Sequence, residues 1–295
     1  MSKAVQMTLI LPAILIFVLF FAMMPVVLQF GPDGNSIHLS WKTGFWHIKQ
    51  YFSGIGTGDS FRFFIGKNEF NFWEEIGFYF RISFIYVIAG GLLGTFIGIF
   101  AGIYFAISNS RWMKSIVDLV GSLPDFILIL MMQFAVVFIA SETGIVIFEV
   151  ATLTSDDPAI VLPIIAMVLV PANYMIRNVA MQMKLTLTED YISNAKARGL
   201  SKSYIIFYHA LPNVLPYIKG DLHKLMGILL GNLFIVEYLF NNNGISMLIF
   251  TNAFVDGYFQ YDIIVNGLLS FMVLYGIGYA VLRVFLFLLG KVFQR

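Results

Sequence analysis

Residues 83–107 read SFIYVIAGGLLGTFIGIFAGIYFAI, an apolar run that contains no charged side chain. A bilayer core about 30 Å thick is spanned by about 20 mainly apolar helical residues. Helices are expected because lipid offers no partner to exposed backbone groups, and the run is too continuous for an alternating barrel strand. Five further stretches have comparable length and character: about 8–30, 117–140, 159–181, 222–240 and 264–290. The sequence therefore predicts an all-α polytopic membrane protein with about six transmembrane helices.

The composition of the whole chain agrees with a lipid environment. Hydrophobic residues make up 59% of the 295 residues, and charged residues make up only 12%. A single soluble core stops growing at about 250–300 residues, so a soluble domain could not bury this much apolar surface. The net charge of +1 argues against a nucleic-acid partner, which requires a clustered basic surface. The absence of cysteine excludes disulfides and thiolate catalysis.

The first apolar run, residues 8–30, follows Lys3 and could be mistaken for a secretory signal. Such a signal has an apolar region of about 7–15 residues, followed by small residues at a cleavage site. The run here is longer, and no small-x-small site follows it. We therefore expect residues 1–30 to form an N-terminal transmembrane helix that stays in the protein.

The loops orient the spans, because Lys and Arg are in excess on the cytoplasmic side of a membrane. The connections after the second and fourth spans carry Arg111, Lys114, Lys184, Lys196, Arg198, Lys202 and Lys219. The loops 141–158 and 241–263 carry no basic residue and contain Glu142, Glu149, Asp156, Asp157, Asp256 and Asp262. Both termini are then expected to be cytoplasmic, as Lys291 and Arg295 also indicate.

Residues 31–82 then form an external loop, although this loop holds basic as well as acidic residues. Trp41, Trp46 and Trp73 suit the headgroup level of the bilayer. Apolar residues at helical spacing predict an interfacial helix over 70–82 that runs into the second span. The loop either seals the outer face as an aromatic lid or contacts a partner protein. Residues 83–295 form a core of five spans.

Gly90, Gly94, Gly98 and Gly102 recur every four residues in the second span. Small residues at this spacing let two helices approach closely. We expect this stripe to pack within the subunit rather than against a second subunit.

The polar stretch 188–216 reads TEDYISNAKARGLSKSYIIFYHALPNVLP and separates the fourth span from the fifth. Thr188 suits the N-cap of a first helix, because carboxylates follow it in the first turn. Gly199 stands directly after this helix, where a left-handed residue is needed. Ser201 suits the N-cap of a second helix, which Pro212 is expected to end.

The first of these two helices has about ten residues and is marginal in water without a docking surface. Because the topology places it in the cytoplasm, we expect its partner to be a cytoplasmic protein. The alternative is an interfacial hairpin that rests on lipid headgroups through its basic residues.

The stretch resembles the so-called EAA loop of binding-protein-dependent ABC importer permeases, especially that of the dipeptide, oligopeptide and nickel branch. The loop of this branch reads roughly D-Y-x-x-x-A-x-A-x-G-L-S, with an H-A-L-x-N element after it. Ser193 and Asn194 depart from the older consensus of Glu and Ala, as is ordinary for the peptide branch. The matching residues are Asp190, Tyr191, Ala195, Ala197, Gly199, Leu200, Ser201, His209, Ala210, Leu211 and Asn213.

The resemblance implies that the first loop helix is a coupling helix, seated in a groove on an ATPase subunit. Ala195 and Ala197 would let the two backbones approach closely, and Arg198 would pair with an acidic groove wall. The second helix would anchor the hairpin to its own membrane bundle through Tyr204, Ile205, Tyr208 and Leu211. The residues expected in ATPase coupling are Glu189, Asp190, Tyr191, Ala195, Ala197, Arg198, Gly199, Leu200, Ser201, Leu211 and Pro212.

Two flanking elements extend the resemblance over roughly residues 80–295. Residues 122–126, SLPDF, look like the S-[IL]-P-x-F/W element early in the third span. Residues 236–240, VEYLF, look like the V-E-x-x-F element, although Asn243 and Ser246 then replace the proline and second glycine of the family. Ionisable residues near span ends can be reached by water and mark pathways. The residues expected in a translocation pathway or gate are Ser122, Pro124, Asp125, Phe126 and Glu237.

The chain contains no G-x-x-x-x-G-K-[ST] phosphate loop and no H-E-x-x-H motif. We therefore expect no catalytic residue, no metal site and no cofactor on this chain, and ATP and Mg on separate ATPase subunits. The resemblance implies a type I ABC importer permease fold in the cytoplasmic membrane of a bacterium. It also implies three kinds of partner: a second homologous permease, two ATP-binding subunits and an extracellular substrate-binding protein.

The function expected from the resemblance is ATP-driven import of peptides, with nickel or another small solute as the second candidate cargo. A secondary transporter driven by an ion gradient is an alternative from another class. Such a transporter needs ionisable residues near mid-membrane and often has inverted repeats. A membrane scaffold that transports nothing is the remaining alternative.

Overall fold

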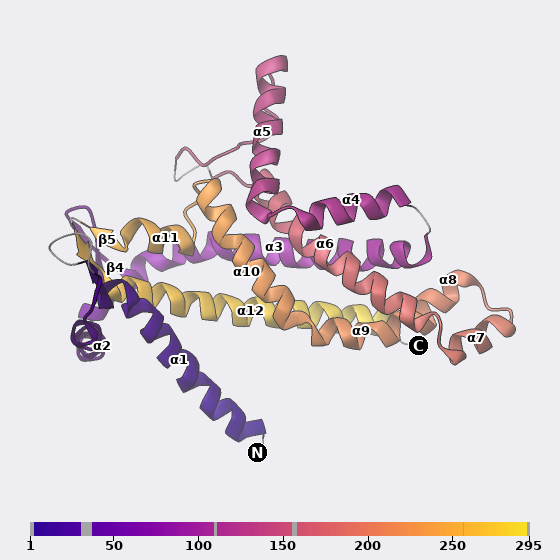
Figure 1. Ribbon diagram of the computed structural model, residues 1–295, viewed down its shortest axis with the longest axis horizontal. Helices are drawn as coiled ribbons and strands as arrows, with labels where there is room; N and C mark the ends of the chain where they lie inside the picture. The colour runs from indigo at the N-terminus through magenta and orange to yellow at the C-terminus, as the bar shows by residue number, and fades with distance from the viewer. Residues whose placement is uncertain (1–2, 31–36, 109–110, 155–157, 256, 294–295) are drawn as a thin grey trace. The chain divides into compact units, whose positions relative to one another are not determined.

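The computed structural model describes residues 3–30, 37–108, 111–154, 158–255 and 257–293 (Figure 1). Contacts divide the chain into two compact units. The first, here called the N-terminal unit, is Met1–Arg81 with Gly244–Val273, and the second, the core unit, is Ile82–Asn243 with Leu274–Arg295. The topology prediction also used Asp156, Asp157, Asp256 and Arg295, which lie outside the described residues.

The N-terminal unit is built mainly from short elements. Its helices are α1 (Lys3–Val27), α2 (Trp41–Ile55), the single turn η1 (Asp59–Phe61) and α11 (Ile245–Asn252). Its strands form three antiparallel hairpins: β1 (Leu28–Phe30) with β2 (Ile37–Leu39), β3 (Arg62–Ile65) with β4 (Asn68–Asn71), and β5 (Phe254–Val255) with β6 (Tyr258–Phe259). Neither α2 nor these hairpins were predicted from the sequence.

The core unit is helical in the residues described. Its helices are α4 (Arg111–Ser122), α5 (Asp125–Thr143), α6 (Val161–Thr186), α7 (Asp190–Ala197), α8 (Lys202–Tyr204), the π turn η2 (Ile205–Ala210), α9 (Leu211–Gly220) and α10 (Leu222–Leu239). Two long helices, α3 (Phe72–Ile107) and α12 (Tyr261–Phe293), begin in the N-terminal unit and continue in the core unit.

Five helices of the described residues are long and apolar enough to cross a membrane: α3, α5, α6, α10 and α12. They fall on five of the predicted spans, so the chain is an all-α polytopic membrane protein. The remaining predicted span, residues 8–30, falls on α1, of which Pro12–Val27 is a shorter apolar helix. A sixth span stays a prediction, as does the division of the chain at residues 30 and 82.

The third predicted span, residues 117–140, is wrong as a single helix. The chain breaks between α4 and α5 at Leu123–Pro124, and Pro124 has an extended ψ of 142°. Proline lacks the N–H that a continuing helix would need. The helix starts again at once, because the Pro124 carbonyl accepts the N–H groups of Ile127 and Leu128 at 3.0 and 3.2 Å. Of α4 and α5, only α5 is long enough to cross a bilayer.

The helix predicted over residues 70–82 begins at Phe72 in the structure, two residues later than expected. Phe70 and Asn71 belong to β4, where they pair with Phe63 and Arg62. The Asn71 side chain then accepts the backbone N–H of Trp73 at 2.9 Å. Such a side-chain acceptor satisfies a free N–H at a helix start. The helix α3 therefore begins at Phe72 and runs without a break to Ile107.

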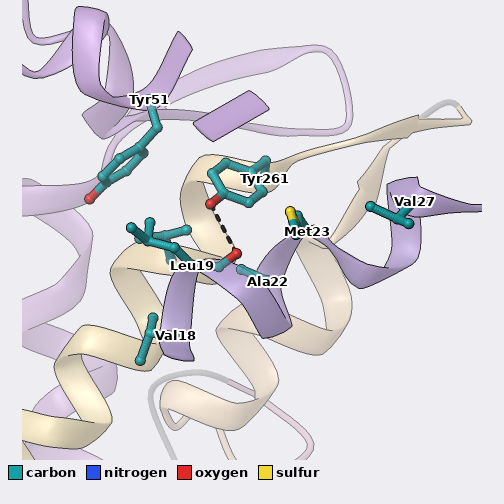
Figure 2. Packing of buried hydrophobic residues seen from close by; sticks show 8 residues of the cluster. Val18, Leu19, Ala22, Met23, Val27, Tyr51 and Tyr261 are labelled. Carbon is teal, nitrogen blue, oxygen red and sulfur yellow. Dashed lines mark hydrogen bonds between the residues drawn. The ribbon is translucent and has the colours of Figure 1, made fainter. Parts of the chain in front are cut away.

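One core of the N-terminal unit lies around α1 (Figure 2). Val18, Leu19, Ala22, Met23 and Val27 of α1 cluster with Tyr51, Tyr261 and Val265. The Tyr261 hydroxyl donates to the Leu19 carbonyl at 3.2 Å, as the dashed line in Figure 2 marks. The cluster joins segments far apart in sequence.

A buried polar network joins the same elements. The Tyr51 hydroxyl donates to Asn266 Oδ1 at 2.8 Å, and Asn266 Nδ2 donates to the Ser60 carbonyl at 2.8 Å. Ser60 Oγ closes the ring by donating to the Tyr51 carbonyl at 2.6 Å. Because buried polar groups are costly when unpaired, this ring fixes how α2, η1 and α12 meet.

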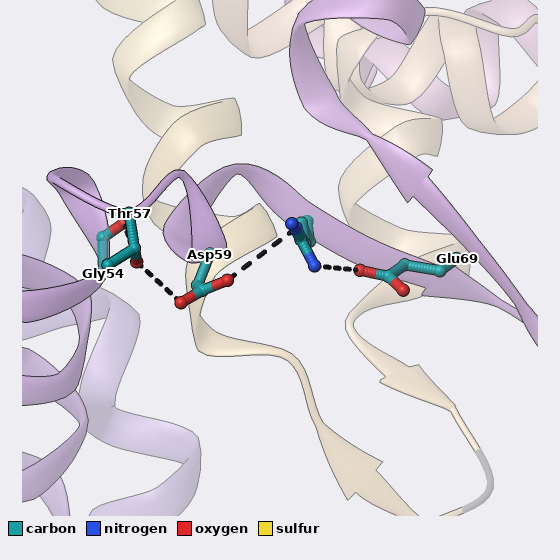
Figure 3. A network of polar contacts seen from close by, with 5 residues as sticks. Gly54, Thr57, Asp59 and Glu69 are labelled. Carbon is teal, nitrogen blue, oxygen red and sulfur yellow. Dashed lines mark hydrogen bonds and ion pairs between the residues drawn. The ribbon is translucent and has the colours of Figure 1, made fainter.

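A second polar network lies on the surface of the same unit (Figure 3). Thr57 Oγ1 donates to Asp59 Oδ2 at 2.6 Å, and Arg62 lies between Asp59 and Glu69 at 3.8 and 3.3 Å. These groups are exposed, and exposed ion pairs contribute about 0–1 kcal/mol. Their contribution to the stability of the β3–β4 hairpin, and of the whole unit, is therefore small.

The core unit is assembled by close contact of α3 with α6. A Cβ added to Gly90, Gly94, Gly98 or Gly102 would meet Met167, Pro171, Met175 or Val179 respectively. At Gly98 the added atom would lie only 2.2 Å from Met175 Cβ. The prediction that the glycine stripe packs within the subunit is confirmed.

Candidate coupling hairpin and pathway residues

The first helix of the predicted hairpin, α7, has 8 residues, from Asp190 to Ala197. Ile192 and Ala195 are its buried residues, which seat one side of the helix on its own chain. Asp190 lies in the first turn and Lys196 in the last, as the helix dipole favours. The predicted N-cap is wrong: Thr188 Oγ1 donates to the Leu185 carbonyl at 2.7 Å, and the N-cap position is taken by Glu189.

The turn after α7 is fixed by backbone hydrogen bonds. Gly199 has a φ of +74°, a region that residues with a Cβ rarely adopt. Its N–H donates to the Lys196 carbonyl at 2.9 Å, and the Leu200 N–H donates to Ala195 at 3.4 Å. This pair of bonds is the Schellman motif, so the predicted role of Gly199 as helix terminator is confirmed.

The second helix begins as expected, since Ser201 Oγ accepts the N–H of Tyr204 at 3.3 Å. The prediction that Pro212 ends this helix is wrong. Pro212 lies at the start of α9, which continues to Gly220. The π turn η2 precedes it, with the Leu211 N–H bonded to the Ile206 carbonyl. This wider turn moves the preceding carbonyls away from the place where the proline ring would clash.

The π turn also changes the face through which the second helix is anchored. Ile205, Ile206, Ala210 and Leu211 are buried. Tyr204 and Tyr208, which were predicted on the anchoring face, are exposed, and their rings stack on one another at 4.9 Å. The prediction is therefore confirmed for Ile205 and Leu211 and wrong for the two tyrosines, because the extra residue in the turn shifts the helical phase.

The predicted coupling residues fall into two groups by exposure. Ala195 and Leu211 are buried and hold the hairpin to its own chain, and Pro212 is half-buried. Burial and the nearby Glu189 carboxylate both raise the pKa of the Tyr191 phenol. The exposed residues, which are free to meet another surface, are Glu189, Asp190, Tyr191, Ala197, Arg198, Gly199, Leu200 and Ser201.

The predicted pathway residues of the third span lie at the break between α4 and α5. Ser122, Pro124 and Phe126 are exposed, and Asp125 is half-buried at the start of α5. Asp125 lines a hollow of about 200 Å³, together with Asn173 and Tyr174 of α6. Nearby, Arg177 of α6 forms an ion pair with Asp118 of α4 at 2.8 Å. The α4–α5 break is thus tied to the helix that leads into the hairpin.

Glu237 is in a different setting from the one expected. It is fully buried in α10, whereas its place near the end of the span predicted that water would reach it. Ser83 Oγ donates to Glu237 Oε1 at 2.5 Å, so the carboxyl group joins α10 to α3. Access to water was predicted from nearness to the end of the span, and it is wrong because α3 covers this side of α10. A role for Glu237 in gating stays a prediction.

A polar cluster between α6 and the α9–α10 junction was not predicted from the sequence. Tyr174 Oη and Asn178 Nδ2 both donate to Asp221 Oδ2 at 2.5 Å, and Lys224 Nζ lies 4.9 Å from the centre of the Tyr174 ring. Tyr174 and Asn178 are four residues apart in α6, but Asn173 and Arg177 stand beside them, so this spacing did not single them out. Asp221 lies one residue before the predicted fifth span.

The helices and the hairpin define a multi-pass α-helical membrane protein with a polar turn-containing segment between two apolar helices. Residues 94–295 match the family described as "Binding-protein-dependent transport system inner membrane component". The match covers more than half of the 295 residues, so the chain belongs to this family.

Individual relatives agree with the family. The chain is 32% identical over 167 residues to the dipeptide transport system permease protein DppB of Bacillus subtilis, covering 55% of this chain and 52% of that protein. It is 28% identical over 222 residues to DppB of Alkalihalophilus pseudofirmus, covering 66% of each chain. It is 23% identical over 214 residues to the glutathione transport system permease protein GsiC of Salmonella choleraesuis, covering 70% of this chain and 65% of that protein. The chain thus spans about half to two thirds of the length of the curated relatives it matches.

Proposed function

We propose that this chain is the transmembrane permease subunit of an ATP-driven, binding-protein-dependent importer. The observation that carries the proposal is the hairpin α7–α9. Its first helix exposes charged residues, ends in a Schellman turn at Gly199, and lies between the apolar helices α6 and α10. A short exposed helix of this kind needs a docking surface, and an ATPase subunit supplies one.

The proposed assembly contains a second homologous permease, two ATP-binding subunits and an extracellular substrate-binding protein. ATP and Mg are bound by the ATP-binding subunits, and this chain binds no cofactor and no nucleic acid. Family membership and the relatives named as transport system permeases support this assembly. The subunit then sits in a bacterial cytoplasmic membrane with both termini in the cytoplasm.

Peptides are the proposed cargo. Two relatives are named as dipeptide permeases and a third as a glutathione permease, and glutathione is itself a small peptide. Nickel or another small solute is the second candidate cargo. A transporter driven by an ion gradient is the alternative that one observation favours, since Glu237 is a carboxyl group fully buried in a spanning helix.

The test is uptake into vesicles that contain this subunit with its co-expressed partners. We expect labelled alanine di- and tripeptides to enter only with ATP, and to enter equally when an uncoupler has collapsed the proton gradient. Uptake that stops with the uncoupler while ATP remains would favour the ion-driven alternative. ATP hydrolysis without any peptide uptake would favour a membrane scaffold.

The coupling role is tested by Arg198→Glu and Gly199→Val. Arg198 is exposed beside α7, and a β-branched residue at the positive φ of Gly199 is strained by about 1–2 kcal/mol. We expect both variants to insert in the membrane but to lose the ATP-binding subunits on purification. Lys219→Gln, which removes a charge outside the hairpin turn, serves as control. Normal co-purification and normal uptake in both variants would contradict the proposal.

The orientation is tested by labelling. The natural chain has no cysteine, so single-cysteine variants report one position each. A membrane-impermeant maleimide should label Asp59→Cys from outside intact cells, and should label Lys196→Cys only after the membrane is opened. Labelling of Lys196→Cys in intact cells would show that the hairpin lies outside the cell, and it would contradict the proposed coupling to a cytoplasmic ATPase.

A further inference from the structure

The polar cluster between α6 and the α9–α10 junction borders a hollow that is open on one side. The hollow has a volume of about 470 Å³, and its lining includes Tyr174, Arg177, Asn178, Asp221 and Lys224. Arg177 and Lys224 are exposed, and the other three side chains are half-buried. The cluster therefore combines fixed polar groups with an open side.

Tyr174 is not at the end of its helix. Tyr174 lies 13 residues after Val161 and 12 residues before Thr186, the two ends of α6. At 1.5 Å per residue, these distances are about 20 and 18 Å, so Tyr174 is near the middle of a helix that spans the membrane. Asp221, which accepts a hydrogen bond from Tyr174, directly precedes Leu222, where α10 begins.

Lipid chains cannot cover such a face. Ionisable side chains inside a membrane face the bundle interior or a water-filled cavity, because hydrocarbon cannot solvate them. The open side of the cluster therefore faces water or another protein.

Asp221 and Lys224 form no salt bridge in the part of the chain that the structure describes, whereas Arg177 pairs with Asp118. Asp221 receives hydrogen bonds from Tyr174 and Asn178, both on Oδ2. Lys224 Nζ lies over the Tyr174 ring, 4.9 Å from its centre. A carboxylate and an ammonium group without an ionic partner among the described residues thus both line the hollow.

The apolar residues beside these charges complete a pattern that fits one class of ligand. Met181 and Tyr217 also line the hollow, and both are exposed. A short peptide with free termini carries an ammonium group, a carboxylate and small side chains between them. Asp221 suits the ammonium group, Lys224 suits the carboxylate, and Met181 and Tyr217 suit the side chains.

We infer that this hollow is a contact site for the two charged ends of a short zwitterionic peptide on its way through the membrane. The inference rests on the proposed function, because it assigns a place on this chain to the proposed cargo. Opposite charges that meet inside a membrane pathway strengthen binding and steer the ligand. The site is expected to be of modest affinity, since the hollow is open on one side.

The test uses the complete importer in vesicles, with a photoreactive residue in the hollow. Met181 is replaced by p-benzoylphenylalanine, and the vesicles are irradiated while they take up labelled alanine di- and tripeptides. We expect label on this subunit, and we expect an excess of unlabelled dialanine to suppress it. N-acetyl-dialanine amide, which lacks both charges, should not suppress it.

Charge variants then identify the residues that hold the peptide. Lys224→Gln and Asp221→Asn should each lower the labelling about tenfold, the loss expected for one charged contact. Lys224→Arg should retain it. Lys219→Gln is the matched control, because Lys219 lies five residues away beside Phe287 and is outside the hollow.

Three results would overturn the inference. Photolabelling of phospholipid or of the second permease, unchanged by peptide, would show that another molecule covers the hollow. ATP-dependent peptide uptake without any labelling at Met181 would remove the site and leave the proposed function intact. Absence of ATP-dependent peptide uptake in the unmodified importer would remove the proposed function and the inference with it.

Discussion

One contact in each unit shows a different way of joining helices. In the core unit, four glycines of α3 lie against four residues of α6, so shape joins these two helices. In the N-terminal unit, buried hydrogen bonds among Tyr51, Ser60 and Asn266 join α2, η1 and α12. Each unit also uses the other kind of contact, as the Ser83–Glu237 bond of the core unit and the apolar cluster around α1 show. Packing by shape needs small residues repeated along a long helix, whereas the polar ring needs only three side chains and suits short elements.

This difference can be measured with two buried alanines as reporters. Ala22 lies in the N-terminal unit and Ala166 in the core unit, and both are almost fully buried. In a chain without cysteine, Ala22→Cys and Ala166→Cys react with a thiol reagent only when their own unit opens. The rate of labelling in detergent micelles then reports each unit separately.

The largest effect is expected from Gly98→Ala. The new Cβ would lie 2.2 Å from Met175 Cβ, so α3 and α6 must move apart. Overpacking of this kind costs about 3 kcal/mol, which raises labelling of Ala166→Cys by about 100-fold. Gly231→Ala, where the structure has no atom within 4 Å of the added Cβ, is the control and should leave the rate unchanged. Equal rates for both variants would contradict the role assigned to the stripe.

A smaller effect is expected from Asn266→Ala in the N-terminal unit. The change leaves the Tyr51 hydroxyl and the Ser60 carbonyl without their partner. Buried groups that lose a partner cost about 1–3 kcal/mol, so labelling of Ala22→Cys should rise by about 10-fold or more. Ser270→Ala, which removes only a half-buried bond on the same helix, is the control. A rise at Ala166→Cys instead of Ala22→Cys would show that the polar ring does not belong to the N-terminal unit.

The same ring should make the N-terminal unit sensitive to alkali. Burial, with a smaller contribution from Asp262, raises the pKa of Tyr51 to about 12. The unfolded chain loses this proton near pH 10 and the folded chain only near pH 12, so stability falls as the pH rises between these values. We expect a loss of up to about 2 kcal/mol in thermal unfolding, and a smaller loss in Tyr51→Phe. Identical pH profiles for the two proteins would contradict the raised pKa.

The smallest effect on the isolated subunit is expected from Phe134→Ala on α5. Only 11% of the apolar window of α5 is buried, against 44% for α3, and Phe134 is 72% exposed. Exposed substitutions usually change stability by less than about 0.5 kcal/mol. Labelling at both reporters should therefore stay unchanged. A large increase at Ala166→Cys would show that α5 packs on the core unit more closely than the structure indicates.

Features set by local chemistry could be predicted from the sequence. The apolar runs gave the spans because a bilayer imposes length and composition. Gly199 and Ser201 were assigned correctly because a left-handed turn and an N-cap depend on one residue and its near neighbours. The glycine stripe was assigned correctly because its period alone determines the face that it occupies.

Features that depend on distant residues could not be predicted. The bond between Tyr51 and Asn266 joins positions 215 residues apart. The cluster around Asp221 forms because Tyr174 of α6 lies opposite it, and no spacing within one segment indicates this. The break at Pro124 is of another kind: a proline in an apolar run was visible, and hydrophobicity was wrongly given more weight than the missing N–H.

The π turn at residues 205–210 has a consequence for the whole hairpin. A π turn holds one residue more than the α-helical turn it replaces, which rotates everything beyond it by about 100° around the helix axis. Deleting a single residue there would restore regular α-helical winding. The ring of Pro212 would then clash with the preceding turn. The direction of α7 relative to α9 and α10 would change by about a quarter of a revolution. The direction in which α7 points is thus set by one extra residue in the helix, and it does not depend on which side chains α7 exposes.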